Sequence, residues 1–162
     1  MSLPNPQNDE ERTGRQILQN WLKANAPNFT MAELGCWCEH EDCQMLPILQ
    51  PDFVNFVQEL QHLRNVLHFP LMVNSGYRCP HYNREIYVKR ARKADLPEPG
   101  PLEHLDGPHT KGAADIGIAF ERMYKLVAEA VSREMGVGLA QKGDIASRYI
   151  HVDNLGSRIW TY

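Results

Sequence analysis

Apolar residues recur every three or four positions in three stretches of the chain, the pattern of helices with one buried face. These stretches run from Thr13 to about Asn25, from an N-cap at Asp52 to about His68, and from Glu121 to Met135. The second is the clearest, because its apolar positions form one stripe: Phe53, Phe56, Val57, Leu60, Leu63 and Leu67. In the third, the expected buried face consists of Tyr124, Val127, Val131 and Met135.

Two further helical segments are predicted by local signals. Thr30 and Glu33 have the spacing of a capping box, which indicates a short helical turn within Phe29 to Leu34. A second run follows Asn83 and continues to about Lys93, where basic residues suit the negative end of a helix dipole.

β-prone runs complete the pattern. They lie at 69–74, which is expected to be a buried strand ending in a turn at Ser75-Gly76, and at 113–120, 136–139, 149–153 and 158–162. Residues 95–108 are rich in proline and glycine and predict a long irregular loop. The fold class is therefore α+β, with a small antiparallel sheet and helices packed on one side.

Length and charge limit the possible organisation. The chain has 162 residues, of which 43% are hydrophobic, so we expect one domain over residues 13–162 after a flexible N-terminal segment at 1–12. A net charge of −3 gives no basic surface of the kind that binds nucleic acid. No apolar run is long enough to span a membrane, and the N-terminus lacks a signal-peptide core, so cytoplasmic synthesis is expected.

The residues that indicate chemistry are His109, Asp115 and His151. Two histidines and a carboxylate are ligands that a catalytic zinc ion takes when it keeps one position for water. The pleat of a strand would place His151 and Asp153 on one side, with Ile150 and Val152 facing the core. A zinc ion held in this way would acidify a bound water and polarise a peptide carbonyl, which is the chemistry of amide hydrolysis.

Three cysteines lie close together at Cys36, Cys38 and Cys43, and a fourth follows at Cys79. The spacing of the first three matches neither the two-pair zinc pattern nor a redox pair. Metal ligands, unligated thiols and disulfide-linked thiols all remain open from the sequence.

Four motifs in order resemble the M15 family of zinc peptidases. They are Phe29 to Leu34 with the following cysteines, the run from Pro70 through Ser75-Gly76-Tyr77-Arg78-Cys79-Pro80 to Asn83, the run from Pro108-His109 to Asp115-Ile116, and His151-Val152-Asp153. This family includes D-alanyl-D-alanine carboxypeptidases, L,D-type endopeptidases and phage endolysins, and it shares its fold with the Hedgehog signalling domain.

The resemblance implies roles for individual residues. It assigns one zinc ion per chain to His109, Asp115 and His151, and it assigns substrate binding to Arg78, whose planar cationic group suits a carboxylate or a carbonyl oxygen. The implied activity is hydrolysis of peptidoglycan stem peptides or cross-links, either as a carboxypeptidase or as an endopeptidase. We expect a monomer that degrades the cell wall after release by a phage-type holin. The alternative is a zinc-containing binding module of the same fold that has lost catalysis.

Three positions depart from the pattern of the family. Asp115 follows His109 by six positions instead of seven, Gly107 replaces a serine, and Arg148 stands where many members carry the acidic general base. Two other acids are therefore candidates for the catalytic base. They are Asp144 and Asp153, of which Asp153 could instead orient a metal-binding histidine.

Overall fold

The computed structural model describes residues 9–38, 40, 43 and 50–162. The predicted flexible segment lies largely outside them. Their elements follow in this order: α1 (Asp9–Asn25), α2 (Met31–Leu34), α3 (Pro51–Leu67), β1 (Met72–Ser75), α4 (Pro80–Lys93), α5 (Pro108–Lys111), β2 (Ala113–Gly117), α6 (Glu121–Ser132), β3 (Gly136–Ala140), the 3-10 turn η1 (Ile145–Ser147), β4 (Tyr149–Asp153) and β5 (Arg158–Thr161).

The strands form one sheet in the order β1-β2-β4-β3-β5. Pairing is antiparallel from β1 through β2 and β4 to β3, whereas β3 and β5 pair in parallel. The parallel pair arises because the chain reverses after β4 and then lies beside β3, which itself runs opposite to β4. The predicted α+β class and the largely antiparallel sheet are confirmed, and the β3–β5 pair is the exception.

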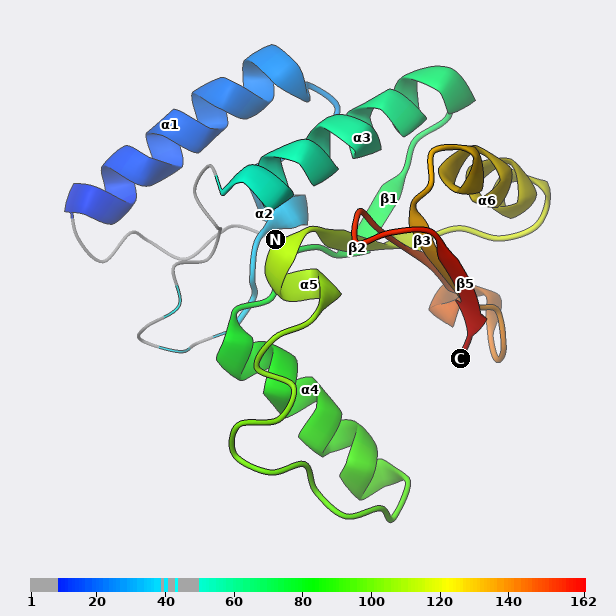
Figure 1. The fold of residues 1–162 in the computed structure, drawn as a ribbon. Coiled ribbons are helices and arrows are strands. Elements are labelled where there is room, and N and C mark those ends of the chain that lie inside the picture. Colours follow the sequence, from blue (N-terminus) through cyan, green and yellow to red (C-terminus); the bar gives the residue numbers. More distant parts are fainter. Residues whose placement is uncertain (1–8, 39, 41–42, 44–49) are drawn as a thin grey trace.

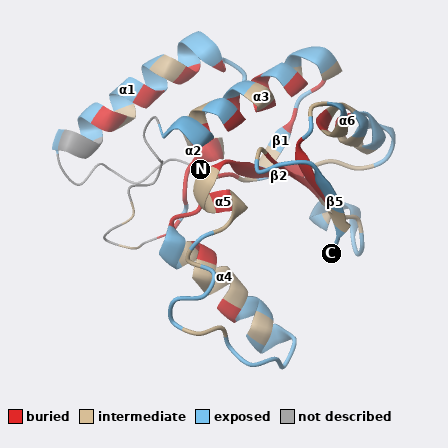
Figure 2. Ribbon diagram, in the orientation of Figure 1, coloured by how far each residue is buried: buried red, intermediate tan, exposed pale blue. Residues whose placement is uncertain are grey.

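Helices α1, α3 and α6 lie on one side of the sheet, and α4 and α5 lie on the other (Figure 1). The main apolar core is shared by the first group of helices and the strand residues that face them, which include Ile116, Val137, Ile150 and Val152. Buried segments accordingly concentrate along the central strands and the inner faces of the helices (Figure 2). The expected packing of helices on one side thus describes this core, but α4 and α5 add a second layer that the sequence did not indicate.

Three helices differ in detail from the prediction. Helix α1 begins at Asp9, four positions before Thr13. The N-cap of α3 is Gln50, because Pro51 occupies the first helical position and places Asp52 inside the first turn. Of the face predicted for the third helical stretch, Val127, Val131 and Met135 pack in or against the core, whereas Tyr124 is 70% exposed. The fully buried side chains of α6 are Leu126 and Ala130, which the prediction did not include.

The segment around β1 also corrects the prediction. β1 is an edge strand whose Met72 is 62% exposed, so it is not the buried strand expected at 69–74. Helix α4 begins at Pro80, before Asn83, because the thiol of Cys79 caps it by accepting a hydrogen bond from the Tyr82 amide. Among the described residues, no helix is both long and apolar enough to cross a membrane.

The capping box of α2 is confirmed. The Thr30 hydroxyl accepts a hydrogen bond from the Glu33 amide at 3.3 Å, and the Glu33 carboxylate accepts one from the Thr30 amide at 2.9 Å. These two bonds satisfy backbone donors that a helix start leaves without partners. They fix the point from which the chain enters its cysteine-rich segment.

Candidate metal centre and active site

One row of paired residues crosses four strands on the face opposite the apolar core. Asp115 of β2 pairs with His151 of β4, which pairs with Gly138 of β3, and Gly138 pairs with Trp160 of β5. The neighbouring residues Ile150 and Val152 belong to the apolar core, so the predicted alternation along β4 is confirmed. The register thus places two predicted zinc ligands side by side.

His109 reaches the same place from α5, the helical turn that precedes β2. Gly112, between His109 and Asp115, has an extended φ of −160°, which other residues also adopt. Glycine is required there for space, because a Cβ would lie 2.7 Å from Cβ of Phe56 and 2.9 Å from the Asp52 carbonyl oxygen. The helical turn accounts for the six-residue spacing between His109 and Asp115.

The three predicted ligands meet at one carboxylate oxygen. Oδ1 of Asp115 lies 3.2 Å from Nε2 of His109 and 2.9 Å from Nδ1 of His151. All three side chains are buried.

The opposite nitrogen of each ring has a hydrogen-bond acceptor. Nδ1 of His109 donates to the Gly76 carbonyl at 2.7 Å, and Nε2 of His151 donates to Oδ2 of Asp153 at 3.1 Å. These acceptors keep the proton on the outer nitrogens in the neutral rings, which leaves the lone pairs of the inner nitrogens directed toward Asp115. Metal-binding histidines are oriented by this kind of outer partner.

This donor set fits a zinc ion. One ligand atom from each of His109, Asp115 and His151 lies within 4.8 Å of the others. Ligand atoms on a tetrahedral zinc ion with bonds of about 2.0 to 2.1 Å would be about 3.3 Å apart. The observed separations of 2.9 and 3.2 Å are close to that value.

The pKa shifts of the three groups reflect burial and mutual contact. Burial lowers the pKa of His109, and it outweighs the opposing contact with Asp115. Burial also acts to lower the pKa of His151, but hydrogen bonds to Asp115 and Asp153 leave it raised. For Asp115, burial acts to raise the pKa, yet the two histidines hold it below its usual value. Asp115 is therefore a carboxylate, the form that binds a cation.

Arg78 approaches this group from the turn between β1 and α4. Its Nη2 donates to Oδ2 of Asp115 at 2.8 Å, and its Nε donates to the Ser75 hydroxyl at 3.0 Å. The Arg78 amide also donates to the His109 carbonyl at 2.9 Å, which ties the two motifs together. Arg78 lines the same cavity as the predicted ligands, as its expected role in substrate binding requires.

The two candidate bases have different surroundings. Asp153 is fully buried, and its Oδ1 accepts from the Leu155 amide at 2.9 Å, while its Oδ2 accepts from His151 and from Arg158. Burial acts to raise the pKa of Asp153, but the contact with His151 and the Leu155 amide leave it lowered. Its contacts favour the role of orienting His151. Asp144 is exposed before η1 and is not among the side chains that line the cavity.

The cavity beside His109 and His151 has a volume of about 250 Å³. It also contains cationic and aromatic side chains that the sequence analysis did not assign to the site: Arg90, Arg158, Tyr87, Tyr149, Trp160 and Tyr162. The alternation of Arg158, Trp160 and Tyr162 is the signal that could have identified one face of β5. Asp115 is the one carboxylate among the described lining residues.

The comparisons with known proteins support the resemblance. Residues 27–91 match a family model described as Peptidase M15. Curated proteins and solved structures give no match to the chain. The matched segment contains Arg78 and the cysteines and ends before His109. Over this segment it confirms the resemblance to M15 peptidases that the motifs indicate.

Proposed function

We propose that the protein is a zinc-dependent peptidase. The observation that carries the proposal is the orientation of His109 and His151, whose inner nitrogens face one oxygen of Asp115 while their outer nitrogens are bound to Gly76 and Asp153. A zinc ion bound there would supply a nucleophilic water at neutral pH and would polarise a carbonyl group.

The residues around this group favour a substrate with a negative charge near the cleaved bond. Arg78, Arg90 and Arg158 line the cavity, and guanidinium groups bind carboxylates through paired donors. Arg78 is paired with Asp115 and Arg158 with Asp153, whereas Arg90 contacts the ring of Tyr87, so Arg90 offers its charge most directly to the substrate. A terminal carboxylate or the acidic side chain of a peptide meets this requirement.

Peptidoglycan is the substrate class that we propose. Its stem peptides carry terminal carboxylates, and the M15 resemblance points to the same material. The activity would be removal of a terminal D-alanine or cleavage within cross-links, as a cell wall degrading enzyme of the endolysin type. The sequence names Asp144 as the general base, but Asp144 is exposed and does not line this cavity, so this assignment rests on the sequence alone.

The direct test is digestion of purified stem peptides and cross-linked muropeptides with separation of the products by mass spectrometry. Release of a single D-alanine identifies a carboxypeptidase, whereas separation of cross-linked dimers identifies an endopeptidase. Removal of metal with a chelator should abolish either reaction, and added zinc should restore it. The variant His151→Ala, checked for folding by circular dichroism, serves as the inactive control.

The second candidate is a zinc-containing binding module, and Arg148 at the usual place of an acid favours it. Zinc bound at His109 and His151 without cleavage of any muropeptide would support this candidate and contradict the peptidase. If the parent protein cleaves and Asp144→Asn cleaves at the same rate, the base is another group.

A further inference from the structure

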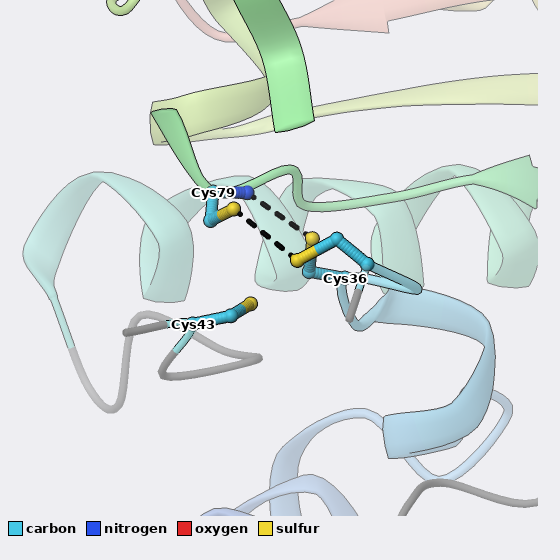
Figure 3. A group of neighbouring side chains, drawn as sticks. Cys36, Cys43 and Cys79 are labelled. Carbon is cyan, nitrogen blue, oxygen red and sulfur yellow. Dashed lines mark hydrogen bonds between the residues drawn. The ribbon is translucent and has the colours of Figure 1, made fainter. Parts of the chain in front are cut away.

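The four cysteines of the chain converge on one point outside the cavity. Their sulfur atoms lie within 4.8 Å of one another. Cys36 and Cys38 follow α2, Cys43 lies further along the same segment, and Cys79 caps α4. Figure 3 shows the sulfurs of Cys36, Cys43 and Cys79 directed toward a common space. The sequence separated Cys79 from the others by more than thirty positions, so only the fold shows a group of four.

The geometry of this group is that of ligands around one ion. Sulfurs on a tetrahedral zinc ion, with bonds of about 2.3 Å, are about 3.8 Å apart. The sulfurs of Cys38 and Cys79 are 3.4 Å apart, and no disulfide joins any of the four cysteines. Four thiols that meet at such distances provide a complete tetrahedral set without any other residue.

We propose that Cys36, Cys38, Cys43 and Cys79 bind a second zinc ion, which has a structural role. Four protein ligands fill a tetrahedral site and leave no position for water or substrate, and this distinguishes structural zinc from catalytic zinc. The chain would then hold two zinc ions instead of the one that the sequence indicates.

The surroundings of the group suit bound thiolates. Four thiolates and one zinc ion carry a net negative charge, which nearby donors must offset. The Cys79 amide donates to the sulfur of Cys36 at 3.3 Å, and the Tyr82 amide donates to the sulfur of Cys79 at 3.4 Å. The N-terminal end of α4 lies at Cys79 and adds the positive end of a helix dipole. Cys36, Cys38 and Cys79 are buried, so water competes little for the ion.

A zinc ion at this point would fasten two distant parts of the chain. The first part is the segment after α2, and the second is the start of α4. Cys79 directly follows Arg78, whose side chain contacts Asp115 and whose amide donates to the His109 carbonyl. The structural ion would therefore hold the β1–α4 turn that places Arg78 in the cavity.

The test is to measure zinc in protein that retains the four cysteines but lacks the histidine site. The full chain is purified under reducing conditions, both unaltered and as the double variant His109→Ala/His151→Ala. We expect about two zinc ions per unaltered chain and about one per double variant. X-ray absorption of the double variant should show four sulfur neighbours at about 2.3 Å. Because this variant is inactive by design, the result does not depend on peptidase activity.

Several outcomes would overturn the second site. These are a double variant without zinc, a metal shell of oxygen and nitrogen in place of sulfur, or a mass that shows disulfides in the purified protein. The reciprocal variants Cys38→Ser and Cys79→Ser should lose one zinc ion and keep the other at the histidine site. If they do not fold, Co²⁺ substitution in the double variant still decides, since thiolate ligation gives intense charge-transfer absorption in the near ultraviolet and other ligation does not.

Discussion

Replacing Asp153 by asparagine tests whether the partner of His151 determines metal binding. The carboxylate accepts three hydrogen bonds, from the Leu155 amide at 2.9 Å, from His151 at 3.1 Å and from Arg158 at 2.6 Å. An asparagine amide in the same place would direct its NH2 group at one of these donors, whichever way it turns. It would also remove the negative charge that makes the imidazole a stronger ligand.

Loss of such an outer partner weakens metal binding by about 10- to 100-fold, or about 1.4 to 2.8 kcal/mol. We expect Asp153→Asn to fall in this range and to retain its fold. The assay is titration with Co²⁺ in competition with a chelator, followed through the visible absorption that the His109→Ala/His151→Ala double variant lacks. Asp144→Asn is the matched control, since it removes the same charge from an exposed position. An affinity for Asp153→Asn within about twofold of the unaltered protein would refute the reasoning.

Three further variants probe the cavity, the sheet and the core. Arg78→Lys keeps a positive charge but loses the planar group whose donors contact Asp115 and Ser75. We expect kcat/KM to fall by about tenfold or more while the zinc content stays the same. An unchanged kcat/KM would exclude a role for the guanidinium group. In Gly138→Ala the new Cβ would lie 2.7 Å from the Trp160 ring. The free energy of unfolding in urea should fall by about 1 to 3 kcal/mol, and the tryptophan fluorescence should shift. An unaltered spectrum would mean that no close contact exists. Leu60→Ala removes a fully buried side chain and should cost about 2 to 5 kcal/mol in the same urea experiment, with Val66→Ala at an exposed position of the same helix as the control.

The sequence determined those parts of the molecule that depend on local pattern. The periodicity of 52–68 predicted α3, and the alternation around His151 predicted which side of β4 faces the core. The same reasoning named His109, Asp115 and His151, which the structure brings together. These features could be recognised because the spacing of apolar residues is a property of a short segment and the ligand type is a property of a single residue.

The sequence pattern predicted burial wrongly where the exposure of a residue depends on the place of its strand in the sheet or on the packing of its helix. The run at 69–74 is apolar enough for a buried strand, but its place at the edge exposes Met72. Tyr124 fits the same helical stripe as Val127 and Val131, which pack against the core, yet Tyr124 is 70% exposed. The buried face of α6 is centred on Leu126 and Ala130. Periodicity fixes which residues share a face, but tertiary packing decides which of the apolar faces is covered.

Tertiary structure alone decided the environment of the chemistry. The Gly76 carbonyl orients His109 from a different motif, and the register of β3 with β4 and β5 places Trp160 beside His151. The fold likewise brings Cys79 to the three earlier cysteines. The sequence alone identifies the ligand types, because each ligand is a single residue. The hydrogen bonds that orient them join distant segments, so they exist only once those segments pack together.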